Sequence, residues 1–348
     1  MGFLPDYENI VDCAKNKEAK RLPLYEHIIS DEIIEQVIGK ELSALRDGDD
    51  SDIEEYMNRY CNFYLLMGYD VVSYEQCAGP VMPGSGSLGG HVDGVIKTRA
   101  DFDNYPWGRI PALFFEKNSK YFSALRKALP NGMKGVGGVG NGLFECVQDI
   151  TGYMDLCYIL YDDPSLFEDL FMAVGDMLYE IWNRFIKEFG DIFCVCRFGD
   201  DLGFRSNTLL PSSIIKQHVI PQYARIIELI HKAGKPFLLH SCGNIFNIMD
   251  DLICISKIDA KHSNEDQIAP FPEWVKRYGA EIGNFGGIDT DAVCRLKQSE
   301  MKEYIIDVID QCSGHGGFAF GSGNSIPDYV PVDNYIFMTE TVRKKRGE

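Results

Sequence analysis

His240 and Cys242 are two residues apart at the end of an apolar run over residues 235–239. In an extended strand, side chains at positions i and i+2 point to the same face, so the imidazole and the thiol should point together where the strand meets its loop. Zinc accepts mixed nitrogen and thiolate ligands, and a catalytic zinc site needs three protein ligands and one open position. The pair therefore predicts two ligands of a zinc site. The alternative is a buried histidine that stands beside one of the chain's eleven cysteines by chance.

The elements that must position this pair alternate along the chain. Short apolar runs typical of strands are separated by stretches with apolar residues at helical spacing, a pattern that indicates an α/β fold with a parallel sheet. We expect helices over residues 52–67, 164–189, 211–233 and 299–311. Asp163 is the expected N-cap of the helix over residues 164–189, which begins with Pro164 in its first turn. Eight strands are expected, over residues 22–26, 70–75, 134–138, 192–198, 236–242, 260–263, 281–285 and 317–321.

Eight strand and helix units predict a TIM (β/α)8 barrel as a single domain over residues 1–348, with a helical extension at residues 1–20. In such barrels the active site is built from the loops at the C-terminal ends of the strands. Polar or glycine-rich clusters follow nearly every expected strand, at residues 26–27, 75–77, 140–141, 199–201, 240–242, 262–265, 286–289 and 322–324.

Two segments, residues 84–89 and 135–140, match the pattern G-x-G-x-x-G. A dinucleotide site needs a strand before this pattern, a helix after it, and an acidic residue at the end of the next strand. The first segment lacks the strand and the helix, and the acidic residues after the second, Asp155 and Asp162, fall in or after a helix. We therefore expect flexible loops here and no nicotinamide cofactor.

Composition limits the class of protein. The 348 residues are 45% hydrophobic and 25% charged, and 34 basic against 52 acidic residues give a formal charge of −18. Such a surface repels nucleic acids and anionic membranes, so neither is an expected partner. The eleven scattered cysteines favour reduced thiols. Because no apolar stretch approaches the length of a membrane span and the start lacks a secretory pattern, a cytoplasmic location is expected.

Five segments between residues 192 and 338 carry a family resemblance: GDDLGFRSNTLL, GKPFLLHSCGNI, IDAKHSNED, FGGIDTDAVCR and FGSGNSIPDYVPVDNY. They resemble the uroporphyrinogen decarboxylase superfamily, particularly its corrinoid-dependent methyltransferase branch. The resemblance implies a TIM barrel and a zinc-bound His-x-Cys pair after the fifth strand, followed by a further cysteine after the eighth. This chain has Asn324 in place of that cysteine. It also lacks the arginine-rich segment of true uroporphyrinogen decarboxylases, so decarboxylation in the haem pathway is not expected.

The missing cysteine leaves the third zinc ligand open. Cobalamin-independent methionine synthase, another zinc barrel, has a glutamate just over twenty residues beyond its His-x-Cys pair. In this chain Glu265 lies 23 residues beyond Cys242. Adjacent parallel strands end about 5 Å apart, so a carboxylate there can reach a shared ion. Glu265 is therefore the expected third ligand, in competition with His262 and, more weakly, Glu75 and Cys294.

The resemblance implies a zinc-dependent methyltransferase that moves a methyl group between a small O-methyl, N-methyl or thiol substrate and cobalamin. No segment of this chain resembles a corrinoid-binding D-x-H-x-x-G motif, so the cobalamin should be carried by a separate corrinoid protein. A homodimer is left open. Further expected roles are catalytic for Asp200, Asp201 and Glu75, substrate-binding for Glu26, Arg205 and Asn141, and cofactor-binding for Gly323 and Asn324.

Two rival hypotheses remain. In the first, a metal-free decarboxylase or lyase acts on a small carboxylate, with Asp200, Asp201 or Glu265 handling the proton and Arg21 or Arg205 holding the acid. In the second, the chain is a corrinoid-binding accessory protein that has lost its zinc. The aromatic-rich region over residues 77–134 either lines an apolar substrate pocket or forms a lid on the barrel.

Overall fold

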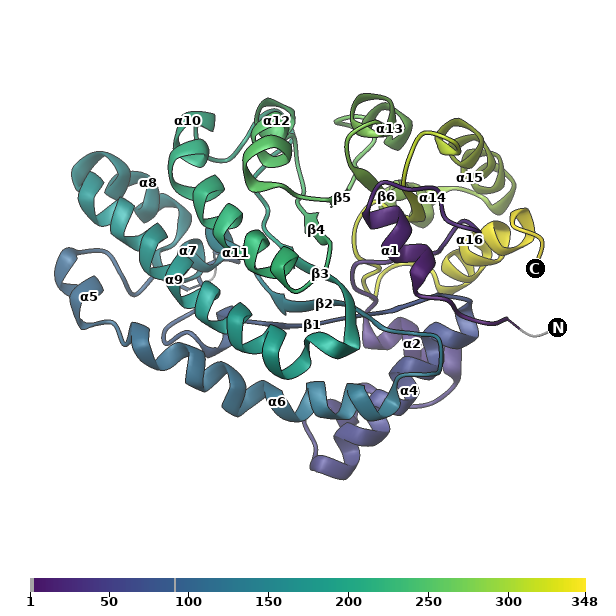
Figure 1. Cartoon of the computed structure of the whole chain (residues 1–348), viewed down its shortest axis with the longest axis horizontal. Helices are drawn as coiled ribbons and strands as arrows, with labels where there is room; N and C mark the ends of the chain where they lie inside the picture. Colours follow the sequence, from purple (N-terminus) through teal and green to yellow (C-terminus); the bar gives the residue numbers. More distant parts are fainter. Residues whose placement is uncertain (1–2, 91) are drawn as a thin grey trace.

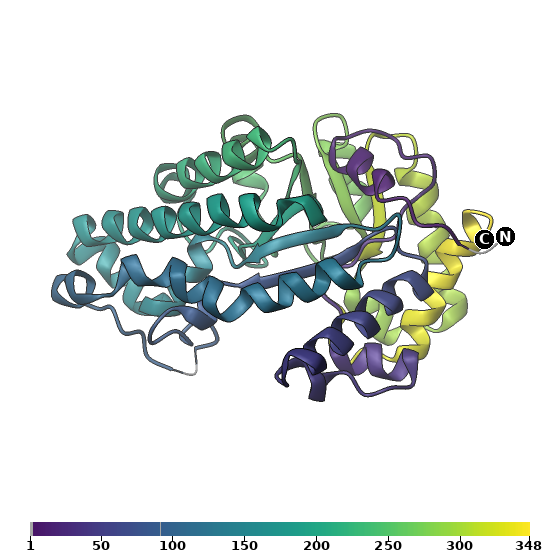
Figure 2. The same ribbon diagram turned by 60° about the horizontal axis from the view of Figure 1, so that its bottom comes forward.

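Seven parallel strands form a curled sheet in a computed structural model that describes residues 3–90 and 92–348. Each strand is hydrogen-bonded to the next strand along the chain, in the order β1 to β7. Helices surround the sheet, as Figures 1 and 2 show, which confirms the predicted α/β barrel. The strands are β1 (Val72–Cys77), β2 (Gly135–Gly140), β3 (Phe193–Gly199), β4 (Phe237–His240), β5 (Ala260–His262), β6 (Gly283–Ile288) and β7 (Phe318–Ser322).

The predicted first strand, residues 22–26, is reduced to a single bridge between Leu24 and Phe320 of β7. Tyr25 N donates to Phe320 O at 2.9 Å, and Phe320 N donates to Pro23 O at 3.0 Å. Pro23 has no N–H with which to continue the ladder, which limits this pairing. We call residues 22–26 the closing segment, because they join the beginning of the barrel to its last strand.

The helices follow the strands around the outside of the barrel (Figure 1). The long helices α6 and α9 run alongside β1 and β2, as the turned view makes clear (Figure 2). The helices are α1 (Glu8–Ala14), α2 (Asp31–Ile38), α3 (Ser43–Arg46), α4 (Asp50–Met67), α5 (Arg99–Asn104), α6 (Ile110–Ala128), α7 (Leu143–Thr151), α8 (Tyr153–Asp162), α9 (Pro164–Phe189), α10 (Ser212–Ile214), α11 (Ile220–Lys232), α12 (Met249–Asp251), α13 (Phe271–Tyr278), α14 (Thr290–Arg295), α15 (Gln298–Cys312) and α16 (Val332–Lys345).

The predicted helices are present. The helix predicted over residues 164–189 is α9 with the same bounds, and the Asp163 carboxylate accepts a hydrogen bond from Leu166 N at 2.9 Å. The helix predicted over residues 211–233 consists of α10, a π-helical turn (Ile215–Val219) and α11. The remaining two correspond to α4 and α15. Periodic apolar spacing therefore located the long helices well.

Helix α1 closes the N-terminal end of the barrel. Ile10, Cys13 and Ala14 are fully buried and pack in one cluster with inward-facing strand residues such as Val136 and Leu238. The Cys13 thiol donates to Phe318 O at 3.0 Å. These buried side chains fill the N-terminal end of the barrel with an apolar cluster.

The second G-x-G-x-x-G segment is strand β2 itself, which confirms the strand predicted over residues 134–138 and shows that the flexible-loop interpretation of this segment is wrong. Gly137 has φ +133°, and a Cβ there would lie 2.1 Å from Tyr74 O. These glycines let the backbones of β1 and β2 approach closely, and Arg197 of β3 occupies the space beside Gly137. The glycines therefore serve packing inside the barrel.

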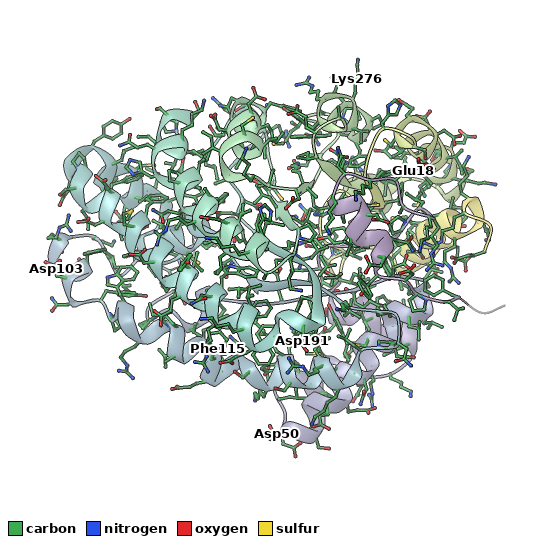
Figure 3. The ribbon with its side chains drawn as sticks, viewed as in Figure 1. Glu18, Asp50, Asp103, Phe115, Asp191 and Lys276 are labelled. Carbon is green, nitrogen blue, oxygen red and sulfur yellow. The ribbon has the colours of Figure 1, made fainter. Side chains whose placement is uncertain are left out.

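Acidic side chains occur on several separate elements. Glu18, Asp50, Asp103 and Asp191 lie at widely separated positions around the ribbon (Figure 3). Among the described residues, no helix combines the length and the apolar character needed to cross a membrane.

Candidate metal centre at the carboxyl ends of the strands

Three histidines lie together at the C-terminal end of the barrel. His240 and His262 are the last residues of β4 and β5 and are direct partners in the strand register. His27 directly follows the closing segment, and its ring stacks on that of His240 with centroids 3.7 Å apart and planes 7° apart. All three side chains are buried. Strand pairing thus brings together residues that are far apart in the sequence.

The hydrogen bonds of these histidines determine their tautomers. His262 Nε2 lies 3.1 Å from Ser322 O, and a carbonyl oxygen can only accept, so His262 Nε2 carries a proton. In a neutral ring His262 Nδ1 is then an acceptor, and His240 Nδ1, 2.7 Å away, must donate to it. The lone pair of His240 is therefore on Nε2, which faces Cys242. We call His240, His262 and Ser322 O the histidine relay.

Burial keeps these imidazoles neutral. It lowers the pKa of His262 from 6.5 to about 3, and it lowers the pKa values of His27 and His240 well below their ordinary range. A neutral imidazole is the form that binds a metal ion. The relay therefore presents His240 Nε2 as a ready electron-pair donor at neutral pH.

The Cys242 thiol is surrounded by polar groups. Its sulfur lies 3.4 Å from His240 Nε2, 3.3 Å from the Asn324 amide nitrogen and 3.5 Å from the Ser263 hydroxyl. Asn324 Oδ1 accepts from Ser325 N at 2.8 Å, so the amide presents its N–H group to the sulfur. Burial raises the pKa of the Cys242 thiol. A thiolate here would need compensation of its charge, either by the Asn324 N–H and the Ser263 O–H or by a cation.

A carboxylate completes this group. Asp201 Oδ1 accepts from Cys242 N at 2.9 Å and lies 4.0 Å from His240 Nε2. Within the described residues, ligand atoms of Asp201, His240 and Cys242 all lie within 4.8 Å of one another. Glu265, the expected third ligand, is not in this group; its Oε1 accepts from Gly243 N at 3.2 Å.

The donor set fits zinc. One imidazole nitrogen, one thiolate sulfur and one carboxylate oxygen are ordinary zinc ligands, and three of them leave a position open. His27, His240 and His262 form a second group within 4.8 Å. In that group the two Nδ1 atoms of the relay are engaged with each other. The set of Asp201, His240 and Cys242 is therefore the better candidate.

The Asp200 carboxylate is directed away from the metal group. It accepts from Phe144 N at 2.9 Å and Glu145 N at 2.8 Å, the first turn of α7, and from the Tyr223 hydroxyl. Burial raises its pKa from 3.8 to about 6. Asp200 thus connects the end of β3 to the positive end of helix α7.

Glu26 is fully buried in the barrel, and Glu75 is half-buried. Glu75 Oε2 accepts from Arg197 Nη2 at 2.6 Å in a buried ion pair. The Glu26 carboxylate accepts from Ser322 N at 3.0 Å and from the Ser322 hydroxyl at 2.5 Å. Burial raises the pKa of Glu26 from 4.5 to about 8, so this group is mostly protonated at neutral pH. Both side chains connect neighbouring parts of the barrel.

The remaining predicted residues have different surroundings. Asn141 donates to Glu145 Oε2 at 3.0 Å and accepts from Gly79 N at 3.2 Å. A Cβ on Gly323 would lie 2.1 Å from Asn264 O, so this glycine permits close backbone contact beside the site. Arg205 is exposed in the loop between Gly203 and Thr208.

Sequence reasoning gave no role to three buried residues. Arg197 donates to the Tyr25 hydroxyl, to His27 O and to Ser73 Oγ, as well as to Glu75. His27 stands in a polar cluster that follows the closing segment, and this was its only sequence signal. Lys261 is the third; its ammonium lies 3.7 Å from the centre of the Trp274 ring and donates to Ser263 O.

Lys261 supports the backbone that carries the Ser263 hydroxyl. Burial lowers its pKa from 10.5 to about 7. Ser263 has φ +99°, an unfavourable conformation for a residue with a side chain. A charged residue in the middle of a three-residue strand was the signal that could have singled out Lys261.

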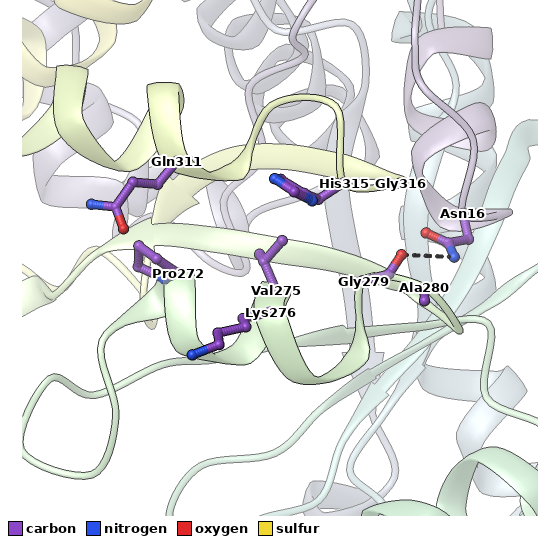
Figure 4. A pocket seen from close by; sticks show the side chains of 9 residues that line it. All are labelled: Asn16, Pro272, Val275, Lys276, Gly279, Ala280, Gln311, His315 and Gly316. Carbon is purple, nitrogen blue, oxygen red and sulfur yellow. Dashed lines mark hydrogen bonds between the residues drawn. The ribbon is translucent and has the colours of Figure 1, made fainter.

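A pocket of about 750 Å³ lies far from this site (Figure 4). It is lined by Val275 and Lys276 of α13 and by residues that precede β6 and β7, including Gly279 and Gly316. The Asn16 amide donates to Gly279 O at 3.1 Å across its edge. Because these residues lie at the N-terminal ends of the strands, the pocket is at the opposite end of the barrel from His240.

Comparison with known proteins identifies the family. Residues 96–345 match the model of the family described as uroporphyrinogen decarboxylase (URO-D). The chain belongs to this family, as its five C-terminal motifs predicted. A search of curated proteins found no match.

Two solved structures share the fold. A methyltransferase from Methanosarcina mazei is similar over 97% of this chain and 98% of its own, with a TM-score of 0.71 and 12% identity. A putative vitamin-B12 independent methionine synthase from Listeria monocytogenes is similar over 94% of this chain and 100% of its own, with a TM-score of 0.52 and 13% identity. Both likenesses agree with a TIM barrel.

Proposed function

We propose that this protein is a zinc-dependent methyltransferase that moves a methyl group between a small methylated substrate and the cobalamin of a separate corrinoid protein. Membership of the URO-D family and the fold shared with the Methanosarcina mazei methyltransferase support this proposal. The observation that carries it is the histidine relay, because the relay leaves the lone pair of His240 on Nε2, 3.4 Å from the Cys242 sulfur.

His240, Cys242 and Asp201 would hold the zinc ion, with Glu265 as the other candidate for the carboxylate ligand. When bound, zinc would act as a Lewis acid on the substrate heteroatom or bind a thiol acceptor in its nucleophilic form. The relay fixes the orientation of the His240 ring, as hydrogen bonds commonly do for zinc-bound histidines. Asn324 and Ser263 donate to the Cys242 sulfur and would stabilise the negative charge of a zinc-bound thiolate.

Metal analysis tests the proposal directly. Protein prepared with zinc and without chelator should retain about one zinc per chain, the content of a single catalytic site. His240→Ala, Cys242→Ser and Asp201→Ala should each lose most of it, whereas Glu265→Ala should retain it. Cys254→Ser is the matched control for the thiol, because Cys254 is exposed and lies outside the metal group. Formation of methylcobalamin from added cob(I)alamin and a panel of methyl ethers and methylamines then measures methyl transfer.

Two results would change the proposal. If Glu265→Ala loses zinc while Asp201→Ala retains it, Glu265 is the third ligand. If the wild-type protein binds no zinc at all, the metal-free lyase or decarboxylase acting on a small carboxylate becomes the better hypothesis.

A further inference from the structure

A second pocket, of about 470 Å³, lies between β1 and the helices α4 and α6. Four tyrosines line it: Tyr56 and Tyr60 from α4, Tyr74 from β1 and Tyr121 from α6. We call it the tyrosine pocket. Its volume falls within the usual range for small-molecule sites, which are mostly apolar and carry a few polar groups.

The tyrosines offer mainly ring carbons to a ligand. The Tyr56 hydroxyl donates to Asp31 at 3.0 Å, the Tyr60 hydroxyl donates to Ser73 O at 2.8 Å, and the Tyr121 hydroxyl donates to Arg46 O at 3.1 Å. Since these three protons are already bonded within the protein, the rings of Tyr56, Tyr60 and Tyr121 act as mainly apolar surfaces, whereas the Tyr74 hydroxyl accepts from Gln76 Nε2 at 2.5 Å. Flat aromatic ligands pack well against such surfaces.

Asn118 on α6 supplies an unpaired polar group in the pocket wall. Its side chain is only 2% exposed, and its amide nitrogen has no hydrogen-bond partner among the described residues. A buried N–H group without a partner destabilises the folded protein. The amide therefore indicates a place where a ligand oxygen would be bound.

A positive charge adjoins this amide. Lys117, the preceding residue on α6, also lines the pocket, is exposed and forms no ion pair within the described part of the chain. Arg46 is another lining cation and is paired with Asp31. Two carboxylates also line the pocket, the exposed Asp47 and Glu75, and Glu75 is paired with Arg197. The Asn118 amide and the Lys117 ammonium both line the pocket from α6, and such donors suit an anionic oxygen group.

The inner end of the pocket leads toward the candidate metal centre. Glu75 and Arg197 line it as a closed ion pair. Arg197 Nη1 also donates to His27 O at 3.0 Å, and the His27 ring stacks on His240. Ile28, the residue after His27, lines the same pocket.

We propose that the tyrosine pocket binds a small aromatic carboxylate, with its carboxylate at Lys117 and Asn118 and its ring against the tyrosines. If the proposed methyltransferase function holds, on which this role rests, the ligand would be the methylated substrate of the reaction. Binding itself requires no zinc, since no lining residue belongs to the metal group.

Calorimetric titration with 4-methoxybenzoate tests the site. Asn118→Leu and Lys117→Gln should each weaken binding at least about tenfold, because each removes a hydrogen bond to a charged group. Lys127→Gln, which removes a charge from the same helix outside the pocket, should bind like the wild type. Benzyltrimethylammonium, a cation of similar size, should not bind.

A measurement of thermal stability separates binding from structural effects. Without ligand, Asn118→Leu should raise Tm by about 2 °C or more, because it removes a buried polar group that has no partner. A fall in Tm would mean that Asn118 supports the fold, and equal 4-methoxybenzoate affinity in Asn118→Leu and wild type would overturn the site. Binding of the cation alone would also overturn it.

The two proposals can fail separately. If 4-methoxybenzoate binds both wild type and Cys242→Ser but the protein holds no zinc, the tyrosine pocket stands and the methyltransferase proposal fails. If zinc is bound and methyl transfer occurs from other donors while 4-methoxybenzoate does not bind, the pocket proposal alone fails.

Discussion

At the scale of single residues, the histidine relay decides which atom of His240 is available to a metal ion. His240 has two ring nitrogens, and the neutral ring can carry its proton on either one. The contact with His262 Nδ1 holds that proton on Nδ1. His262 and Ser322 O therefore determine which nitrogen of His240 can bind a metal ion, without themselves supplying a ligand.

Replacing His262 tests this role. His262→Leu removes the acceptor for His240 Nδ1–H, so zinc affinity should fall about 10–100-fold, the usual effect of losing a hydrogen bond to a metal-bound histidine. His262→Gln, whose side-chain oxygen can accept the same proton, should recover part of the loss. Competition with a chromophoric chelator measures both affinities. Unchanged affinity in His262→Leu would show that the relay does not set the tautomer.

The sequence identified part of this site and missed the rest for physical reasons. The His240 and Cys242 pair was predictable because strand periodicity directs both side chains to one face. Asp201, by contrast, was assigned a catalytic role and not a ligand role. Its distance from His240 depends on the path of a loop, which the sequence pattern does not determine. Lys261 and Arg197 were missed because a charged residue within a strand is ordinarily exposed, and only the complete barrel buries them.

At the scale of elements, the glycine-rich strand β2 shows how one residue type allows two strands to pair. Apolar periodicity predicted helix α9 to the residue, because 26 residues carry many repeats of the pattern. The glycines of β2 have no such pattern, and the strand was predicted only as far as residue 138, with Gly140 in the loop that follows. Their role depends on the approach of Tyr74 O and Arg197, which are distant in sequence.

A methyl group at Gly137 should disrupt this pairing. Gly137→Ala would place a Cβ 2.1 Å from Tyr74 O in a backbone with φ +133°. We expect a loss of more than about 2 kcal/mol of unfolding free energy, since the backbone cannot move aside without breaking the β1 and β2 ladder. Urea denaturation measures the loss. Gly108→Ala, where nothing lies within 4 Å, is the control and should be nearly neutral.

At the scale of the whole molecule, one buried acid joins the closing segment to the last strand of the barrel. Glu26 ends the closing segment, and its carboxylate accepts hydrogen bonds from Ser322 at the end of β7. Few backbone bonds connect these segments because Pro23 interrupts the ladder. The side chain of Glu26 therefore contributes to the closure of the barrel, and its protonation state affects the stability of the whole fold.

The stability of the protein should consequently depend on pH through Glu26. Burial raises its pKa from 4.5 to about 8, so the folded state retains a proton that the unfolded chain releases. The contribution of Glu26 is fully present below about pH 4.5 and is lost as pH rises through about 8. Glu26→Gln, a neutral analogue, should remove this dependence and exceed the wild type in stability above pH 8 by up to about 5 kcal/mol, at 1.36 kcal/mol per pKa unit.

Comparing urea unfolding of wild type and Glu26→Gln at pH 5 and pH 9 isolates this effect, because the other titrating groups are common to both proteins. The difference between the two proteins should grow toward pH 9. Glu26→Ala would not serve as well, since it also leaves a cavity beside Ser322. A difference that does not change with pH would mean that Glu26 is charged in the folded barrel and that the hydrogen bonds from Ser322 fully compensate its burial.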